Sequence, residues 1–394
     1  MLALGLLIIL GLLGAKIGNK LKFPMVTGFI IVGILLSPSI SGVIPESILE
    51  KTSPITDIAL GIIAFLVGGS LSMVRLRRLS KQILWITMVQ ATMATIFVAA
   101  LVFLLTPSLI SLKYHSLISM ALILGAVSAA TAPAATLAIV HEYRARGPLT
   151  TTLLAIVALD DAVCIIYFVL CVSLAEIAIK GSITLHSIVQ PLISIVLSVI
   201  LGILFAFLSK CFKRIVHGHE EILTTTLGLI FVASGISKVL GADSLLTNMV
   251  FGFIVENYMD FETMFTVLEK VENVIFALFF TLAGTHFNLD IMRAALPLAL
   301  IIVAGRFSGK YIGSYVGGAI SKAPKTIKKY VGLGLLPKAG VTVGLILFAA
   351  EMPLFEQFMG YALNAILASV ILNELMAPPL TKYAIFKAGE AYRA

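Results

Sequence analysis

The sequence predicts an all-α, polytopic membrane protein with about thirteen transmembrane helices. Of its 394 residues, 59% are hydrophobic and only 12% are charged, about half the charged share of a soluble domain. The mean hydropathy is +1.08. Apolar runs of about 20 residues, the length that spans a bilayer, recur along the whole chain. So few charges cannot cover a water-facing surface, which excludes a nucleic-acid binder, a soluble enzyme and a secreted disulfide scaffold.

The predicted spans follow the apolar runs in order. They are residues 1–18, 24–41, 54–72, 82–106, 116–141, 149–175, 184–210, 221–239, 243–259, 270–288, 293–319, 327–351 and 357–386. The first run has no basic leading region and continues into the next span, so we expect a helix there and not a signal peptide. Spans and short connections use up the chain, and residues 1–394 are expected to form a single membrane domain.

Basic residues are distributed unevenly between the two sets of connections. Of the 28 lysines and arginines, 20 lie in connections on one side of the predicted bundle and five on the other, and three fall inside spans. Cytoplasmic loops carry the excess of basic residues. We therefore expect a cytoplasmic C-terminus and, since the number of spans is odd, an N-terminus outside the cell.

Proline interrupts two of the spans. Span 116–141 contains SAATAPAAT at residues 128–136 with Pro133, and span 327–351 contains GLLPKAG at 334–340 with Pro337 and Lys338. A proline in mid-span frees carbonyls that need an ion or a water cavity as a partner in lipid. The breaks lie seven spans apart, so the broken helices run in opposite directions, as in inverted-topology repeats that cross at an ion site. Two ordinary proline kinks are the alternative.

Two adjacent carboxylates lie in the middle of span 149–175. Asp160 and Asp161 come about 11 residues into this apolar run, near the bilayer midplane. A charge at that depth is costly and marks a functional site. The two side chains point about 100° apart, so both can border one cavity without facing one partner. A carboxylate that exchanges a proton for a dehydrated alkali cation is the minimal device for coupling the two, and we expect Asp160 and Asp161 to serve as this device for a monovalent cation, with Na⁺ before Li⁺ or K⁺ on the resemblance described below.

Span 293–319 carries two bases four residues apart, Arg306 and Lys310, which therefore lie on one helix face. Both are deep enough to need an anion or water. Lysine can give up its proton and arginine keeps its own. We expect Lys310 to pair with Asp160 when the cation is absent and Arg306 to be a permanent structural charge, although the roles of the two bases stay open.

Other polar residues at the breaks are weaker candidates. Ser128 and Thr131 can complete the coordination of a cation through a hydroxyl or a carbonyl, but a hydroxyl bonded back along its own helix is an equal alternative. Lys338 can neutralise the helix ends at the second break, or its long side chain can extend to water.

Several segments together resemble one transporter family. They are FPMVTGF at 23–29, FLVG at 65–68, the broken segment 131–136, the pair at 160–161, GKYIG at 309–313 and LPKAG at 336–340. With these motifs the chain resembles the second family of monovalent cation:proton antiporters, the bacterial and archaeal sodium/proton exchangers with their Kef-type relatives. The resemblance covers essentially the whole chain.

The resemblance implies a function and a division of the chain. Alternating access would move a core bundle, approximately residues 54–175 and 270–386, against a panel that forms a homodimer, approximately 1–53 and 221–260. Asp161 would bind the cation and the proton, and Asp160 would pair with the base. It also implies electrogenic exchange of Na⁺, or else Li⁺ or K⁺, for protons across the cell (inner) membrane in pH homeostasis, with no cofactor. Gly68, Gly69 and Ser70 depart from the family, since many relatives carry an acidic residue there.

Two other functions compete with this interpretation. One is the membrane part of a Kef-type potassium efflux system, or a channel. The other is an intramembrane aspartyl protease, which needs two aspartates on different helices, whereas Asp160 and Asp161 are neighbours on one. We therefore expect a transporter and not an enzyme.

Overall fold

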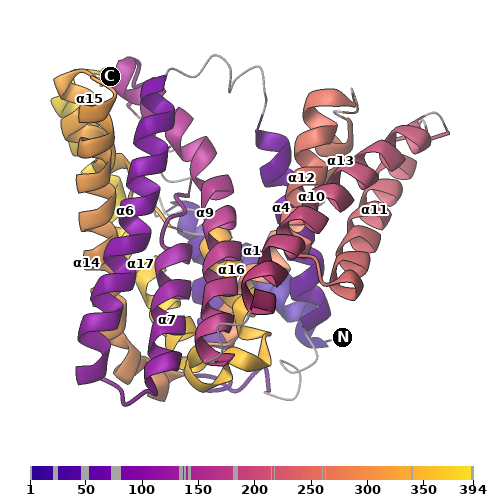
Figure 1. Ribbon diagram of the computed structural model, residues 1–394, viewed down its shortest axis with the longest axis horizontal. Coiled ribbons are helices and arrows are strands. Elements are labelled where there is room, and N and C mark those ends of the chain that lie inside the picture. Colours follow the sequence, from indigo (N-terminus) through magenta and orange to yellow (C-terminus); the bar gives the residue numbers. More distant parts are fainter. Residues whose placement is uncertain are drawn as a thin grey trace.

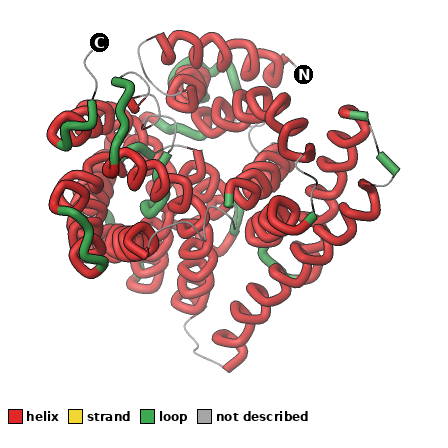
Figure 2. The backbone as a smooth tube through the Cα atoms, turned by 90° about the horizontal axis from the view of Figure 1, so that it is seen from above, coloured by secondary structure: helices red, strands yellow, loops and turns green. Residues whose placement is uncertain are grey.

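The computed structural model describes residues 2–20, 25–45, 53–71, 81–132, 136, 139–140, 143–180, 185–213, 215–216, 218–259, 261, 263–338 and 340–391. Helices make up nearly all of this part of the chain, which contains no strand (Figures 1 and 2). Six helices are each long and apolar enough to cross a membrane, and a bent pair makes a seventh span. Five shorter apolar helices accompany them. The predicted all-helical, multi-pass fold is confirmed.

The helices coincide with the predicted spans. In chain order they are α1 (Leu2–Lys20), α2 (Met25–Leu36), α4 (Ser53–Ser70), α6 (Lys81–Leu105), α7 (Tyr114–Val127), α9 (Pro148–Lys180), α10 (Leu185–Lys213), α11 (His219–Leu240), α12 (Ser244–Tyr258), α13 (Thr263–Thr285), α14 (Leu289–Ile320), α15 (Lys325–Tyr330), the 3₁₀ turn η2 (Val331–Leu335), α16 (Gly340–Ala350) and α17 (Glu356–Lys387).

The structure contains both predicted breaks and brings them together. Helix α7 ends before residues 128–132, which are not helical, and the second span bends by 50° between residues 325–335 and 340–350. Pro133 lies outside the described residues. The amide of Ala132 donates to the carbonyl of Pro337 over 3.0 Å, and Thr136 donates to the carbonyl of Gly334 over 3.1 Å. The two interrupted segments therefore touch, as inverted repeats require.

The helices pack as two groups. The first group, at the left and centre of Figure 1, contains α6, α7, α9 and α14 to α17; the second, toward the right, contains α1, α2, α4 and α10 to α13. The groups meet where α9 and α16 contact α4, α12 and α13. Helix α4 packs mainly against α12, although the sequence-based division assigned residues 54–72 to the core. That division into a core and a panel stays a prediction.

Helix α14 lies directly against the backbone of α6. Glycines at four-residue intervals form the contact face of α14: Gly305, Gly309, Gly313 and Gly317. A Cβ on Gly309 would lie 2.5 Å from the Cα of Ala94, and one on Gly313 would lie 2.6 Å from the Cα of Gln90. Small residues let helix backbones approach this closely in membranes. The contact fixes the neighbouring face of α14, which carries the two bases, relative to α6.

A residue near the end of the described chain caps α9. The carboxylate of Glu390 accepts the backbone amides of Leu149 and Thr150 and the hydroxyl of Thr150, each over 2.7 Å. The first amides of a helix have no partner within the helix, and an anion is favoured at this end. Gly147 leaves room for the carboxylate, which a Cβ at this position would overlap. The start of the aspartate-bearing helix is thus tied to the end of α17.

The α6–α14 contact predicts a stability difference between two glycine substitutions. Gly309→Ala should lower the Tm, because the added methyl group meets backbone atoms that cannot rotate away, and overpacking costs about 1–3 kcal/mol. Gly228 on α11 has no atom within 4 Å of its Cβ position, so Gly228→Ala should keep or raise the Tm, since alanine favours a helix. Thermal unfolding of both variants in detergent checks the difference, and equal Tm values would contradict it.

Candidate functional site

The candidate site lies where the two breaks meet, between the middle of α9 and one face of α14. The carboxylate of Asp160 accepts three hydrogen bonds there. Oδ2 accepts from Lys310 Nζ over 2.7 Å and from Thr131 Oγ1 over 2.6 Å, and Oδ1 accepts from Gln90 Nε2 over 2.5 Å. All four side chains are fully buried. Both oxygens of Asp160 are therefore occupied, as a buried ion pair requires.

The ammonium group of Lys310 has three acceptors, which equals its number of N–H groups. Besides Asp160, these are the carbonyl of Ala129 at 2.5 Å and Oγ1 of Thr131 at 3.0 Å. The Thr131 hydroxyl also contacts the carbonyl of Leu335 at 3.2 Å. Lys310 and Thr131 thus link the aspartate to both interrupted segments.

Arg306 contacts only backbone carbonyls among its hydrogen-bond partners in the described chain. Its Nε donates to Ser128 over 3.0 Å, and Nη1 donates to Leu336 over 2.7 Å. Nη2 donates to Ala130 over 2.5 Å and to Pro337 over 3.3 Å. The carbonyls freed by the two breaks need partners in lipid, and this guanidinium supplies them. Lys310, and not Arg306, forms the ion pair with Asp160.

Asp161 differs from its neighbour in exposure and in hydrogen-bond partners. Its side chain is partly exposed, whereas Asp160 is completely buried. Within the described part of the chain, no side chain or amide forms a hydrogen bond or an ion pair with the Asp161 carboxylate. Since adjacent helix positions diverge by about 100°, Asp161 points away from the ion pair. The site therefore pairs one saturated carboxylate with one that is open to a ligand.

The remaining predicted residues lie near the breaks but outside this cluster. The hydroxyl of Ser128 donates to the carbonyl of Leu124 in its own helix over 2.7 Å, which is the alternative given above for hydroxyls at the breaks. Lys338 is fully buried and does not extend to water. Its Nζ lies 3.2 Å from Oγ of Ser369, and its amide donates to Glu374 over 3.0 Å.

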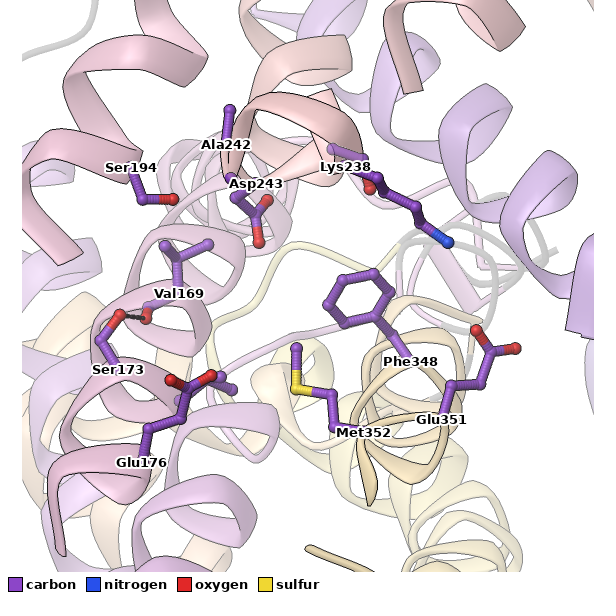
Figure 3. A pocket seen from close by; sticks show the side chains of 13 residues that line it. Val169, Ser173, Glu176, Ser194, Lys238, Ala242, Asp243, Phe348, Glu351 and Met352 are labelled. Atoms are coloured by element: carbon purple, nitrogen blue, oxygen red, sulfur yellow. Dashed lines mark hydrogen bonds between the residues drawn. The ribbon is translucent and has the colours of Figure 1, made fainter. Parts of the chain in front are cut away.

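A cavity of about 440 Å³ lies between the two groups of helices (Figure 3). Glu176 on α9, Asp243 before α12 and Glu351 after α16 contribute carboxylates to its lining, and Phe348 contributes an aromatic face. On α9, Glu176 projects from the same side of the helix as Asp161, within about 60°. Val169 is the lining residue of α9 nearest in sequence to Asp161, so the cavity lies about 12 Å along the helix from the open carboxylate.

Gln90 is the site residue that the sequence analysis missed. It lies in the middle of α6, a 25-residue helix that is otherwise mostly apolar. A polar side chain at membrane depth is costly and marks a functional position. That signal was available in the sequence, but the partner of Gln90 lies 70 residues away, and no spacing rule connects them.

Comparison with known proteins identifies the family. The family described as sodium/hydrogen exchanger, transmembrane, matches residues 5–383. Na(+)/H(+) antiporter 1 of Methanocaldococcus jannaschii is 27% identical over 236 residues, which cover 57% of this chain and 50% of that protein. The matched region therefore covers about half the length of this curated relative.

Two solved structures share the fold. The structure of the sodium proton antiporter MjNhaP1 from Methanocaldococcus jannaschii at pH 8 has a TM-score of 0.78 at 18% identity, covering 98% of this chain and 97% of that one. A structure of MjNhaP1 from an electron-microscopy map has a TM-score of 0.70 at 19% identity, covering 100% and 98%. Identities this low establish the fold alone. Because the family match extends over nearly the whole sequence, the chain belongs to the transmembrane sodium/hydrogen exchanger family.

Proposed function

We propose that the protein is a secondary antiporter that exchanges a monovalent cation, Na⁺ before Li⁺ or K⁺, for protons across the cell membrane. One observation carries the proposal: Asp161, which is partly exposed and has no hydrogen-bond or ion-pair partner among the described residues, lies beside Asp160, which is held in a buried ion pair with Lys310. The family is one of transporters. We accordingly propose no enzymatic activity and no cofactor, with the transported cation and H⁺ as the ligands.

The exchange follows from the charges of these three residues. Asp161 holds either a proton or the cation, and Asp160 and the Thr131 oxygen become further oxygen ligands when their contacts with Lys310 open. A cation arriving between the carboxylates repels the Lys310 ammonium, which releases its proton. One incoming cation then displaces two protons, one from Asp161 and one from Lys310. The transport cycle is electrogenic because two charges move one way and one moves the other.

Alternating access requires two bodies that move against each other. We propose that the packed group of α6, α7, α9 and α14 to α17 is the core, and that the group with α1, α2 and α11 to α13 is the panel that forms a homodimer. The packing of α4 on α12, and of α13 on α1 and α2, favours the assignment of both helices to the panel, although the sequence-based division placed residues 54–72 and 270–288 in the core. The N-terminus would lie outside the cell and the C-terminus in the cytoplasm, following the basic residues.

Asp161→Asn should abolish exchange while the protein stays folded, because an amide can neither release a proton nor neutralise a cation. Proteoliposomes with an acidic lumen report proton release when Na⁺, Li⁺ or K⁺ is added outside. The matched control is Glu176→Gln, which should retain exchange. Glu176 lies on the same side of α9 and forms an ion pair with Lys180.

Two outcomes would reject the proposal in different ways. If a folded wild-type protein releases no protons with any cation, antiport fails and a channel or a partner-dependent potassium efflux system replaces it. Wild-type rates in Asp161→Asn would instead remove this residue from the site.

The rate of exchange should depend on an imposed membrane potential. Since two protons leave for each cation that enters the lumen, a lumen-negative potential should slow proton release and a lumen-positive potential should speed it. The same vesicles, with the potential set by a potassium gradient and an ionophore, check this in Na⁺. Equal rates at both potentials would point to electroneutral exchange.

The buried ion pair makes a prediction about stability. Lys310→Met leaves the Asp160 carboxylate buried without its cation, and breaking such a pair costs about 3–5 kcal/mol. Adding Asp160→Asn removes the unpaired charge, so the double variant should regain most of the lost Tm. Thermal unfolding in detergent compares the two, and a double variant no more stable than Lys310→Met would contradict the reasoning.

A further inference from the structure

The amide of Gln90 has an unusual set of partners. Its side chain is completely buried on α6. Both N–H groups of Nε2 are used, one on the carbonyl of Thr87 at 3.0 Å and one on Oδ1 of Asp160 at 2.5 Å. The amide oxygen Oε1 is buried and has no hydrogen-bond partner in the described part of the chain. In this orientation both N–H groups of Gln90 donate hydrogen bonds, while its amide oxygen accepts none from the described residues.

Packing does not account for a glutamine at this position. Ala91 and Ala94, which follow it on α6, are small and apolar, and Gly313 of α14 faces its backbone; the polar contacts of its side chain in the described chain are with Thr87 and Asp160. A buried oxygen without a partner costs free energy, and native proteins keep few such groups. An apolar side chain of the same length would fill the space without that cost. The polar group is therefore explained by what it donates to.

The helix that carries Gln90 is itself held in place. The glycine face of α14 contacts α6 along its length, so Gln90 and Lys310 extend from two helices whose backbones touch. Asp160 reaches them from a third helix, α9. Its carboxylate lies between a donor from α6 at Oδ1 and a donor from α14 at Oδ2. The two donors together fix both the position and the rotation of the carboxylate.

We propose that Gln90 is a positioning residue of the ion site. It holds Asp160 so that Oδ2 faces Lys310 and Thr131, and it occupies Oδ1, so that an arriving cation meets a preformed geometry beside Asp161. The inference rests on the proposed antiport. A donor that orients a charged ligand before the cation arrives raises the affinity for the cation, because less ordering remains to be done on binding.

The test is a separation of cation affinity from maximal rate. Gln90→Met keeps the length of the side chain and removes the donor. Its apparent KM for Na⁺, or for whichever cation the wild type exchanges, should rise about tenfold, the size expected for one hydrogen bond to a charged group. The maximal rate should stay within about twofold of wild type, since the substituted side chain does not touch the transported ions. Gln90→Leu, which also lacks the donor and adds no charge, should raise the KM as well and serves if the first variant does not fold.

Thr92→Val is the matched control. Thr92 also joins α6 to α9, through a 2.6 Å contact with the Tyr167 hydroxyl, but it does not touch Asp160. If holding the two helices together were the only role of Gln90, both variants would lose Tm alike and neither would change KM. A folded Gln90 variant with wild-type KM overturns the positioning role while the wild type still exchanges ions. Absence of exchange in the wild type overturns the proposed function itself.

Discussion

The ion pair between Lys310 and Asp160 is the interaction on which the site depends. Both side chains are fully buried in a chain whose composition matches a bilayer, where an unpaired charge is costly. The pair holds only because each partner is saturated, Asp160 by three donors and Lys310 by three acceptors. The pair and its partners come from α6, the first break, α9 and α14. The positions of four separate segments are thus set by the needs of two charges.

The breaks and the bases explain each other. Breaking two helices exposes carbonyls that lipid cannot satisfy, and placing two cations in a membrane requires acceptors. The buried bases donate hydrogen bonds to carbonyls that the breaks leave free, and consecutive carbonyls at both breaks have donors. These carbonyls belong to Ser128, Ala129 and Ala130 at the first break and to Gly334, Leu335, Leu336 and Pro337 at the second. Removing the two bases would leave the carbonyls of Ser128, Ala129, Ala130 and Leu336 without these donors.

Much of this arrangement could be predicted from the sequence. Apolar runs of membrane length located the helices, and proline in mid-span located both breaks. The carboxylates and bases stood out because charges are rare at that depth. What the sequence could not supply were pairings set by the third dimension. Spacing placed Arg306 and Lys310 on one face but left open which of them contacts Asp160. Gln90 and Glu390 find their partners across 70 and about 240 residues, distances over which helical periodicity carries no information.

The cap on α9 has a consequence for how the protein is made. Synthesis proceeds from the N-terminus, and domains begin to fold while the chain is still growing. The helix with the two aspartates enters the membrane long before Glu390 leaves the ribosome, so its first turn must wait for a carboxylate supplied by one of the last residues described. Until then its leading amides depend on water. The first turn of the helix that carries the aspartates can therefore be capped only after translation has passed the end of α17. A protein fused directly after Glu390 would crowd this residue and could displace its carboxylate from the amides of Leu149 and Thr150.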